Sequence, residues 1–136
     1  MSFIFSKEAP QALGPYSHAI VADKLVFCSG QTPVHPKTMI IGDPEIQGQT
    51  LQALKNLEAV LQSANCSKTD IIKVNVYLTD MKHFKEMNTV YETFFGSHKP
   101  ARTTVAVVGL PHNALIEIEC IARQNNSNWF VNHGLT

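Results

Sequence analysis

The sequence predicts an α+β fold in which two helices cover one face of a single mixed β-sheet. Runs rich in β-branched residues lie toward both ends of the chain, and two stretches with helical spacing of apolar residues lie between them. The predicted order is therefore β-β-α-β-α-β-β. Helices that are grouped in mid-chain in this way can pack together on one side of a sheet, which gives a two-layer structure.

One domain accounts for most of the 136 residues. A chain of this length buries roughly 68–70% of its unfolded surface, so its core requires neither a disulfide nor a metal. We expect this domain to span residues 1–123 and residues 124–136 to form a C-terminal tail, because asparagine is frequent there and no regular apolar pattern continues. Trp129 and Phe130 are the tail residues that can dock on the domain.

A β-hairpin and a long helix are predicted for the first half. Two short apolar runs separated by a polar pair indicate strands near 18–22 and 25–29. The proline-rich stretch that follows indicates a loop with room for a short strand near 39–41. Between 45 and 64, apolar residues recur every three to five positions, which predicts an amphipathic helix.

The second half predicts a strand, a helix and a closing hairpin. The alternation in IIKVNVYLT, residues 71–79, is typical of a strand. Asp80 is placed to cap a second helix, whose apolar stripe stops before Gly96. The runs RTTVAVV and LIEIECIA flank GLPHNA, which predicts that the last two strands pair with each other as a hairpin.

Composition argues against several classes of protein. Eleven basic residues balance eleven acidic ones, so there is no positive surplus to bind nucleic acid or an anionic membrane. The apolar runs are too short to cross a bilayer, and the N-terminus lacks the pattern of a signal peptide. Three widely spaced cysteines (Cys28, Cys66 and Cys120) indicate packed, reduced thiols rather than a redox or metal role, so we expect a cytoplasmic protein.

No cofactor is expected. The six histidines are scattered and none pairs with another histidine or a cysteine at metal-ligand spacing. The sequence also lacks a glycine-rich phosphate loop, a dinucleotide fingerprint and the G-x-S-x-G motif of serine hydrolases.

The last two strands predict an arginine and two glutamates on one face of the sheet. Because side chains alternate along a strand, Glu117 and Glu119 share the face opposite the apolar residues of their strand. In the predicted hairpin, Arg102 and Thr104 fall on this same face. The group forms either an ordinary salt bridge at an interface or a site where arginine binds a carboxylate and glutamate moves a proton. A buried charge without a partner costs about 3–5 kcal/mol, so an enclosed arginine requires a protein or ligand partner.

The second face of the sheet is predicted to lie against another copy of the chain. Ile71, Lys73, Asn75 and Tyr77 of the central strand mix apolar and polar side chains on this face, which is typical of a surface covered by a neighbouring subunit. Charged residues make up only 16% of the chain, which favours the same conclusion. We therefore expect a homo-oligomer with polar residues in pockets at the contacts.

Weaker candidates lie elsewhere. Gly14 and Pro15 form a restricted turn that either aims the Tyr16 hydroxyl in a fixed direction or packs the ring on the surface. Gly30 ends a strand and allows close approach of a ligand to the backbone, although such glycines are common. Asn88 lies off the aromatic stripe of the second helix, which itself is predicted to be core.

The sequence closely resembles the reactive-intermediate deaminase family, the RidA or YjgF-like proteins, over residues 5–123. The resemblance rests on the separated motifs APQALGPYSHAI, SGQTPV, MNTVYETFF, PARTTVAVVGLP and IEIECIA. Two positions depart from the family pattern. Thr103 stands where serine is more usual, and Thr104 stands where some members have cysteine, so a mechanism that needs that thiol is excluded.

The resemblance implies a chorismate-mutase-like subunit and a homotrimer with clefts between subunits. It also implies hydrolysis of enamine and imine intermediates, such as 2-aminoacrylate, to 2-keto acids and ammonia. By position, Arg102 would bind the substrate carboxylate and Glu117 would activate water. Tyr16 would line the cleft with further residues, which are Ser29, Gly30, Asn88 and Thr104. The residues alone leave open whether Glu117 or Glu119 is the acid or base; the family match favours Glu117.

Two alternatives belong to other classes of function. Some relatives are described as endoribonucleases or translation inhibitors, which the neutral charge balance and the lack of a basic aromatic face disfavour here. A trimer that binds small carboxylates or acts like a chaperone, without turnover, would use the same cleft.

Overall fold

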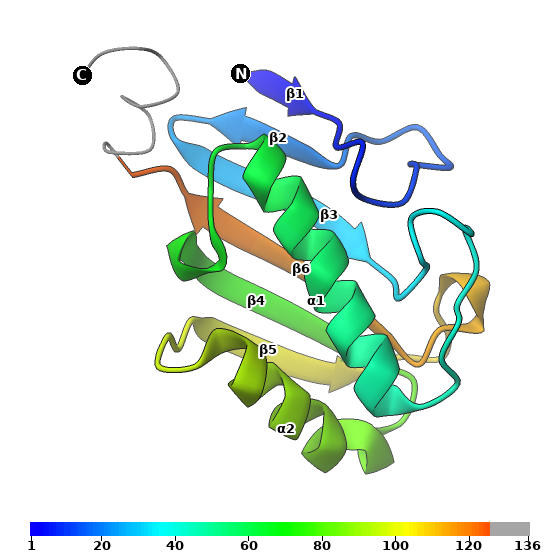
Figure 1. Ribbon diagram of the computed structural model, residues 1–136. Helices are drawn as coiled ribbons and strands as arrows, with labels where there is room; N and C mark the ends of the chain where they lie inside the picture. The colour runs from blue at the N-terminus through cyan, green and yellow to red at the C-terminus, as the bar shows by residue number, and fades with distance from the viewer. Residues whose placement is uncertain (126–136) are drawn as a thin grey trace.

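The computed structural model describes residues 1–125, which form one six-stranded mixed sheet with two α-helices on the same face (Figure 1). This confirms the predicted α+β class. The elements are β1 (Ser2–Ile4), β2 (Ala19–Ala22), β3 (Leu25–Gln31), α1 (Ile46–Ser63), β4 (Ile71–Leu78), α2 (Phe84–Phe95), β5 (Ala101–Ala106) and β6 (Ile116–Arg123). The tail residues Trp129 and Phe130 lie outside the described residues.

The first hairpin and both helices agree with the sequence. β2 and β3 pair antiparallel around the two-residue turn, in which Asp23 and Lys24 both have positive φ. The Asp80 carboxylate accepts a hydrogen bond of 2.8 Å from the Lys82 N–H in the single 3₁₀ turn that leads into α2. At the other end of α2, Gly96 has φ +62°, a left-handed conformation that favours glycine at a helix terminus.

The predicted hairpin of the last two strands is wrong. The sheet order is β1-β2-β3-β6-β4-β5, so β4 lies between β5 and β6 (Figure 1). β4 pairs in parallel with β5 and antiparallel with β6. The reason is that α2 connects β4 to β5 as a crossover, which makes them parallel neighbours. β6 then fills the gap between β3 and β4, and β5 becomes an edge strand.

Three smaller expectations also differ. β1 was not predicted, and no strand forms at 39–41, where one isolated bridge joins Val34 to Ile41. In β4 the register shifts between Ile71 and Lys73. Because of this shift, Ile71 is buried beneath the helices at 1% exposure and Ile72 is 47% exposed on the open face, the reverse of the predicted alternation.

The core fills the space between α1, α2 and the sheet. Leucines of α1 pack against valines of β4 and isoleucines of β6, and Met87 contributes from α2. The three cysteines are free thiols in the same layer. Burial raises the pKa of Cys66 to about 12, so this thiol stays protonated.

Two amides of α1 hold the loops beside the sheet. Asn56 is 1% exposed and donates hydrogen bonds to the Thr32 and Val34 carbonyls, at 3.0 and 2.8 Å. Gln49 donates to the Asp43 carbonyl at 2.9 Å and accepts from the Leu115 N–H at 2.8 Å. These bonds fix the loop after β3 and the start of β6, which lie on either side of one cavity described below.

Gln124 and Asn125, which the sequence placed in the tail, also make hydrogen bonds to the domain. Gln124 donates from its N–H to the Lys24 carbonyl at 2.8 Å and from its side chain to the Ala64 carbonyl at 2.7 Å. Asn125 donates to the Asp70 carboxylate at 3.1 Å. Among the described residues, no helix is long and apolar enough to cross a membrane.

Candidate functional site

Glu117 lies over Gly30, where β6 passes the end of β3. A Cβ atom at position 30 would stand 2.9 Å from the Glu117 Cδ, which is closer than real Cβ contacts allow. The register of β3 shifts between Cys28 and Gln31 at the same place. Gly30 is therefore needed to leave room for the carboxylate. The structure thus explains a glycine that the sequence pattern indicated only weakly.

A small cavity of about 70 Å³ opens beside the Glu117 carboxyl group. Tyr16, Gly30, Met39 and His112 are among its lining residues, so three loops and the ends of β3 and β6 meet here. Ser29 lies next to it and, with Tyr16, borders a second and wider hollow of about 450 Å³. The structure thus brings together Tyr16, Ser29, Gly30 and Glu117, which we name the acid half-site.

Hydrogen bonds around His18 fix the wall of the acid half-site. The buried His18 ring accepts the Ser6 N–H at Nδ1, at 2.8 Å, and its Nε2 lies 2.8 Å from the Pro10 carbonyl. The His18 carbonyl accepts the Ser29 N–H at 2.9 Å. The Ser29 hydroxyl in turn donates to the Ser17 carbonyl at 2.7 Å. These contacts hold the segment that carries Tyr16 against the end of β3.

The two glutamates differ in their surroundings. Glu119 accepts a hydrogen bond of 3.1 Å from the Asn75 amide of the neighbouring strand, so the sheet itself holds this carboxylate. Glu117 faces the cavity instead. Burial raises the pKa of Glu117 above its usual range, and the nearby negative charge of Glu119 raises it further. A carboxyl group in this condition is suited to exchange protons.

Arg102 projects from the other side of the sheet. Its guanidinium carbon lies 4.7 Å from the ring centroid of Tyr91 and 5.7 Å from that of Phe84, on the side of the sheet that the helices cover. The prediction that Arg102 and Thr104 share a face with Glu117 is therefore wrong. In the parallel ladder Arg102 pairs with Val74, which is buried under the helices, whereas Thr103 faces the open side and accepts a hydrogen bond from Lys73 at 2.9 Å.

The physical reason for this error is the amphipathic character of arginine. The predicted face of Arg102 and Thr104 requires the apolar Val105 to lie under the helices, yet Val105 is 43% exposed on the open face. The apolar stem of Arg102 packs on the aromatic rings of α2, and its charged end reaches the edge of the sheet.

A cavity of about 450 Å³ borders Arg102 between α2 and β5. Asn88, Tyr91 and His98 are among its lining residues. Three buried oxygens lack a hydrogen-bond partner of good geometry among the described residues: Asn88 Oδ1, Tyr91 Oη and Thr104 Oγ1. Buried polar atoms are nearly always partnered, so this arrangement suits a polar ligand. We name Asn88, Arg102 and Thr104 the arginine half-site.

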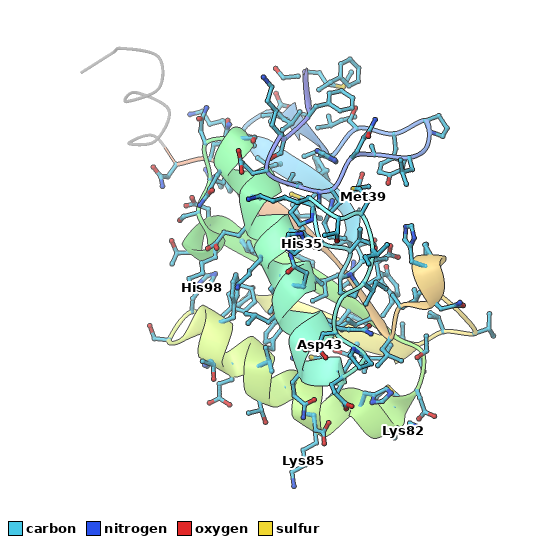
Figure 2. The ribbon with its side chains drawn as sticks, turned by 45° about the vertical axis from the view of Figure 1, so that its right-hand side comes forward. His35, Met39, Asp43, Lys82, Lys85 and His98 are labelled. Carbon is cyan, nitrogen blue, oxygen red and sulfur yellow. The ribbon has the colours of Figure 1, made fainter. Side chains whose placement is uncertain are left out.

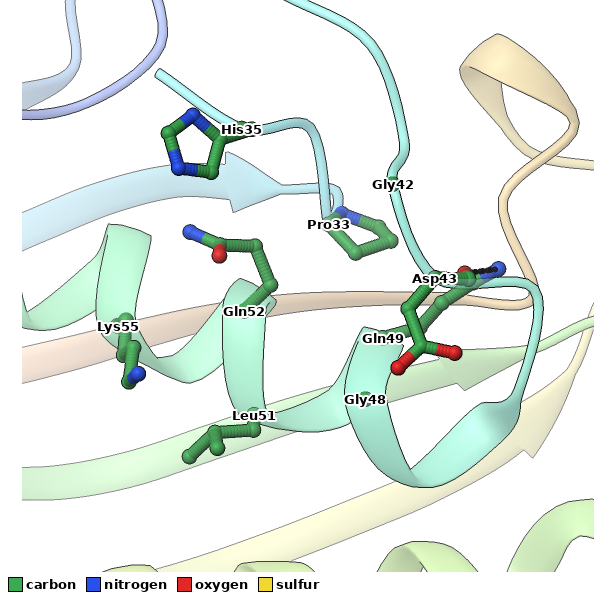
Figure 3. Close-up of a pocket in the computed structure, with 9 residues that line it drawn as sticks. All are labelled: Pro33, His35, Gly42, Asp43, Gly48, Gln49, Leu51, Gln52 and Lys55. Carbon is green, nitrogen blue, oxygen red and sulfur yellow. Dashed lines mark hydrogen bonds between the residues drawn. The ribbon is translucent and has the colours of Figure 1, made fainter. Parts of the chain in front are cut away.

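The acid and arginine half-sites are thus separate within one subunit. Figure 2 labels one lining residue of each cavity, Met39 and His98, and they appear on either side of α1. A further cavity of about 290 Å³ lies beside the N-terminal part of α1, where Asp43, Gln52 and Lys55 line it (Figure 3). None of the residues predicted for the site borders that cavity. Within residues 1–125, no three histidine, cysteine or acidic side chains are grouped to hold a metal ion.

Sequence reasoning missed Tyr91. This residue was assigned to the aromatic stripe of α2, and its ring does lie in the core. The available signal was the hydroxyl group, because a tyrosine in a stripe of otherwise apolar side chains needs a polar neighbour. That neighbour is Arg102.

The comparisons with known proteins agree with this architecture. The fold defines a small α+β protein of the YjgF and L-PSP type, since a putative endoribonuclease from Thermotoga maritima superposes with a TM-score of 0.89 at 42% identity, covering 93% of this chain and 99% of that one. The Escherichia coli protein TdcF, solved with bound serine, superposes with a TM-score of 0.88 at 38% identity, covering 92% of this chain and 100% of that one.

Sequence relatives establish the family. The family model described as Endoribonuclease L-PSP matches residues 6–124, and the chain belongs to this family, which confirms the resemblance to RidA and YjgF proteins. A RutC family protein of Pyrococcus horikoshii is 50% identical over 119 residues, 88% of this chain and 94% of that protein. Reactive Intermediate Deaminase A, chloroplastic, of Arabidopsis thaliana is 41% identical over 119 residues, 88% of this chain and 64% of that protein.

Proposed function

We propose that this chain hydrolyses reactive enamine and imine intermediates, such as 2-aminoacrylate, to 2-keto acids and ammonia. The reaction would take place in clefts between the subunits of a homotrimer, where the arginine half-site of one copy meets the acid half-site of the next. This proposal depends on the observation that Arg102 and Glu117 each border a cavity but lie on opposite faces of one subunit. The arginine half-site supplies a cation that binds an anion, and the acid half-site supplies a carboxyl group that exchanges protons.

The open face of the sheet supports assembly from copies of the chain. Phe27, Ile72 and Val105 are exposed there at 44%, 47% and 43%. Large apolar side chains in such numbers on one side of a sheet are typical of a surface that another subunit covers. A cyclic assembly places the same two surfaces in contact at every interface, so one kind of cleft recurs around the ring.

The named relatives support a small amino-acid-derived substrate. One relative carries the name reactive intermediate deaminase, and TdcF was solved with serine, a small molecule with a carboxylate beside a nitrogen. A 2-imino acid has the same pair of groups. The guanidinium of Arg102 matches a carboxylate in charge and shape, because its planar fork donates two parallel hydrogen bonds.

The chemistry needs no group beyond these side chains. Arg102 binds the carboxylate and places the imine carbon next to a water molecule held by Glu117. The Glu117 carboxylate takes one proton from the water as its oxygen bonds to the imine carbon, and passes that proton to the nitrogen, which gives a neutral carbinolamine. Glu117 then takes the hydroxyl proton as the keto group forms and passes it to the nitrogen, so that the carbon–nitrogen bond breaks and ammonia leaves.

The test is release of pyruvate from 2-aminoacrylate that a serine dehydratase generates in the same vessel. The purified chain should accelerate pyruvate release above the spontaneous rate, and Arg102→Ala and Glu117→Gln should abolish the acceleration while remaining folded. Full activity in a folded Arg102→Ala variant would overturn the proposal. Binding of pyruvate with no acceleration in the wild type would instead favour a trimer that only binds carboxylates.

RNA cleavage is tested alongside, because the family model and several relatives carry that name. The chain has a formal net charge of zero, so we expect RNA binding to be weak and nearly independent of salt. A steep loss of RNA binding with rising salt, together with cleavage products, would favour the nuclease instead.

A further inference from the structure

We propose that Tyr91 is a binding residue of the arginine half-site, whose hydroxyl group donates a hydrogen bond to the carboxylate held by Arg102 and whose ring fixes the guanidinium in place. This inference rests on the proposed function, because it assigns a further contact to the same substrate. It changes the role of Tyr91 from a core residue of α2 to a residue that contacts ligand.

The ring of Tyr91 is the closer of two aromatic supports for Arg102. The guanidinium carbon lies 4.7 Å from the Tyr91 centroid and 5.7 Å from the Phe84 centroid, both within the range of a cation–π interaction. Arginine has several rotatable bonds, and two rings against one guanidinium restrict them. The cation is therefore held in one place before a ligand arrives, which lowers the entropic cost of binding.

The hydroxyl group of Tyr91 is a hydrogen-bond donor without a good acceptor. The residue is only 9% exposed, and its Oη has no hydrogen-bond partner of good geometry among the described residues. Burial raises the pKa of Tyr91 to about 12, although the positive charge of Arg102 acts in the opposite direction. The hydroxyl thus keeps its proton and can donate it to an anion.

Two neighbouring oxygens complete the arrangement. Asn88 lies three residues before Tyr91 on α2 and lines the same cavity, and Thr104 lies two residues after Arg102 on the same face of β5. Asn88 Oδ1 can only accept a hydrogen bond, and it is also without a partner in the described part of the chain. The Tyr91 and Thr104 hydroxyls and the Arg102 guanidinium can donate hydrogen bonds to a carboxylate. The Asn88 carbonyl can accept one from an N–H group beside that carboxylate.

The test compares Tyr91→Phe, which keeps the ring, with Tyr91→Leu, which removes the ring and the hydroxyl. Pyruvate, the proposed product, is the probe, and its dissociation constant is measured by calorimetry on the assembled protein. Tyr91→Phe should weaken pyruvate binding about tenfold, the size of one hydrogen bond to a charged group. Tyr91→Leu should weaken it several-fold more, because the support of Arg102 is lost as well.

Phe94→Leu is the matched control on the same helix. The Phe94 ring packs on the Lys68 ammonium, at 4.5 Å from the centroid, and not on Arg102. This variant loses a similar aromatic ring and should bind pyruvate like the wild type. Thermal unfolding of all three variants reports whether each is folded. Tyr91→Phe removes only one oxygen, so it tests the hydroxyl group even if Tyr91→Leu fails to fold.

The outcomes separate this inference from the proposed function. In steady-state assays Tyr91→Phe should raise KM with little change in kcat, since the lost bond holds the carboxylate and not the reacting carbon. Unchanged pyruvate binding and KM in Tyr91→Phe overturn the role of Tyr91, even if the wild type is a deaminase. Weakened pyruvate binding in a protein whose wild type does not accelerate deamination supports Tyr91 and overturns the proposed reaction.

Discussion

Arg102 and Glu117 lie on opposite faces of the same sheet, on strands that β4 separates. Neither side chain can reach the other inside one subunit. A site that uses both must therefore take one from each of two copies, and this relationship makes the proposed chemistry inseparable from assembly.

Mixed assemblies of two inactive variants should regain activity. We expect Arg102→Ala and Glu117→Ala each to be inactive alone, and their coexpression to restore about a quarter of wild-type activity, because random mixing gives about one cleft in four both intact groups. Pyruvate release per subunit is the measurement. The control mixes the two variants after each has assembled, which should restore nothing until subunits exchange. No recovery from coexpressed, mixed assemblies would contradict a cleft shared between copies.

Gly30→Ala should impair catalysis and leave the fold intact. The new methyl group would meet the Glu117 Cδ at 2.9 Å, so the carboxyl group must move. Misplacing a reacting group by about 1 Å costs on the order of a hundredfold in rate, so kcat/KM should fall by between about ten and a hundredfold. Gly42→Ala is the control, because nothing lies within 4 Å of a Cβ built there. Equal activity of the two variants would refute the role given to Gly30.

The pH dependence of the rate should respond to Glu119. Glu117 must be ionised to accept a proton from water, so activity rises as pH passes its pKa, which burial and the Glu119 charge hold above the usual range. Glu119→Gln removes that charge, lowers the pKa of Glu117 and shifts the acid limb of the profile to lower pH. Profiles of kcat/KM for both proteins check this, and an unchanged acid limb would show that Glu117 is not the titrating group.

The raised pKa of Glu117 also predicts how the stability of the fold changes with pH. The folded state favours protonated Glu117, so an ionised Glu117 destabilises the fold at neutral pH, and this cost disappears below the unfolded pKa of about 4.3. Glu117→Gln should therefore be more stable than the wild type at pH 7, with the difference shrinking as pH falls. Unfolding midpoints measured from pH 7 to pH 4 report it; a difference that grows toward low pH would contradict the assignment.

His18 should be replaceable by glutamine but not by alanine. His18→Ala leaves the buried Ser6 N–H and the Pro10 carbonyl unpaired and should lower the free energy of unfolding by about 1–3 kcal/mol. A glutamine side chain also offers one acceptor and one donor, so His18→Gln should lose less. Denaturant unfolding measures both variants, and hydrogen exchange at Ser6 shows whether the segment carrying Tyr16 stays bound. Identical losses in the two variants would contradict this account.

The sequence predicted local structure well because local signals determine it. The hairpin of β2 and β3, the C-terminal end of α2 at Gly96 and the alternation in β6 follow from turn residues, a helix-terminal glycine and apolar periodicity. Pairing between distant strands has no such signal. β5 and β6 are consecutive in the chain, but the crossover through α2 makes β5 the parallel neighbour of β4.

The composition of the candidate site was predicted from the family resemblance, whereas its geometry was not. Arg102 was assigned to the wrong face because its stem is as apolar as a valine side chain and packs accordingly. The contact between Gly30 and Glu117 depends on a register shift in β3 that no residue pattern indicates. Tyr91 was missed because a buried aromatic ring fits the apolar pattern of a core helix whether or not its hydroxyl group binds a partner.

The side chain of Asn56 makes one wall of the acid half-site open to redesign. By binding two loop carbonyls, this amide sets the path of the segment that carries Met39 into the cavity, where Met39 has φ +61°. The loop's course thus depends on a helix residue as well as on the hydrogen bonds that the loop makes within itself. Under the proposed function, a shorter or more polar side chain at position 39 is the change expected to alter substrate preference while the hydrogen bonds of Asn56 stay in place.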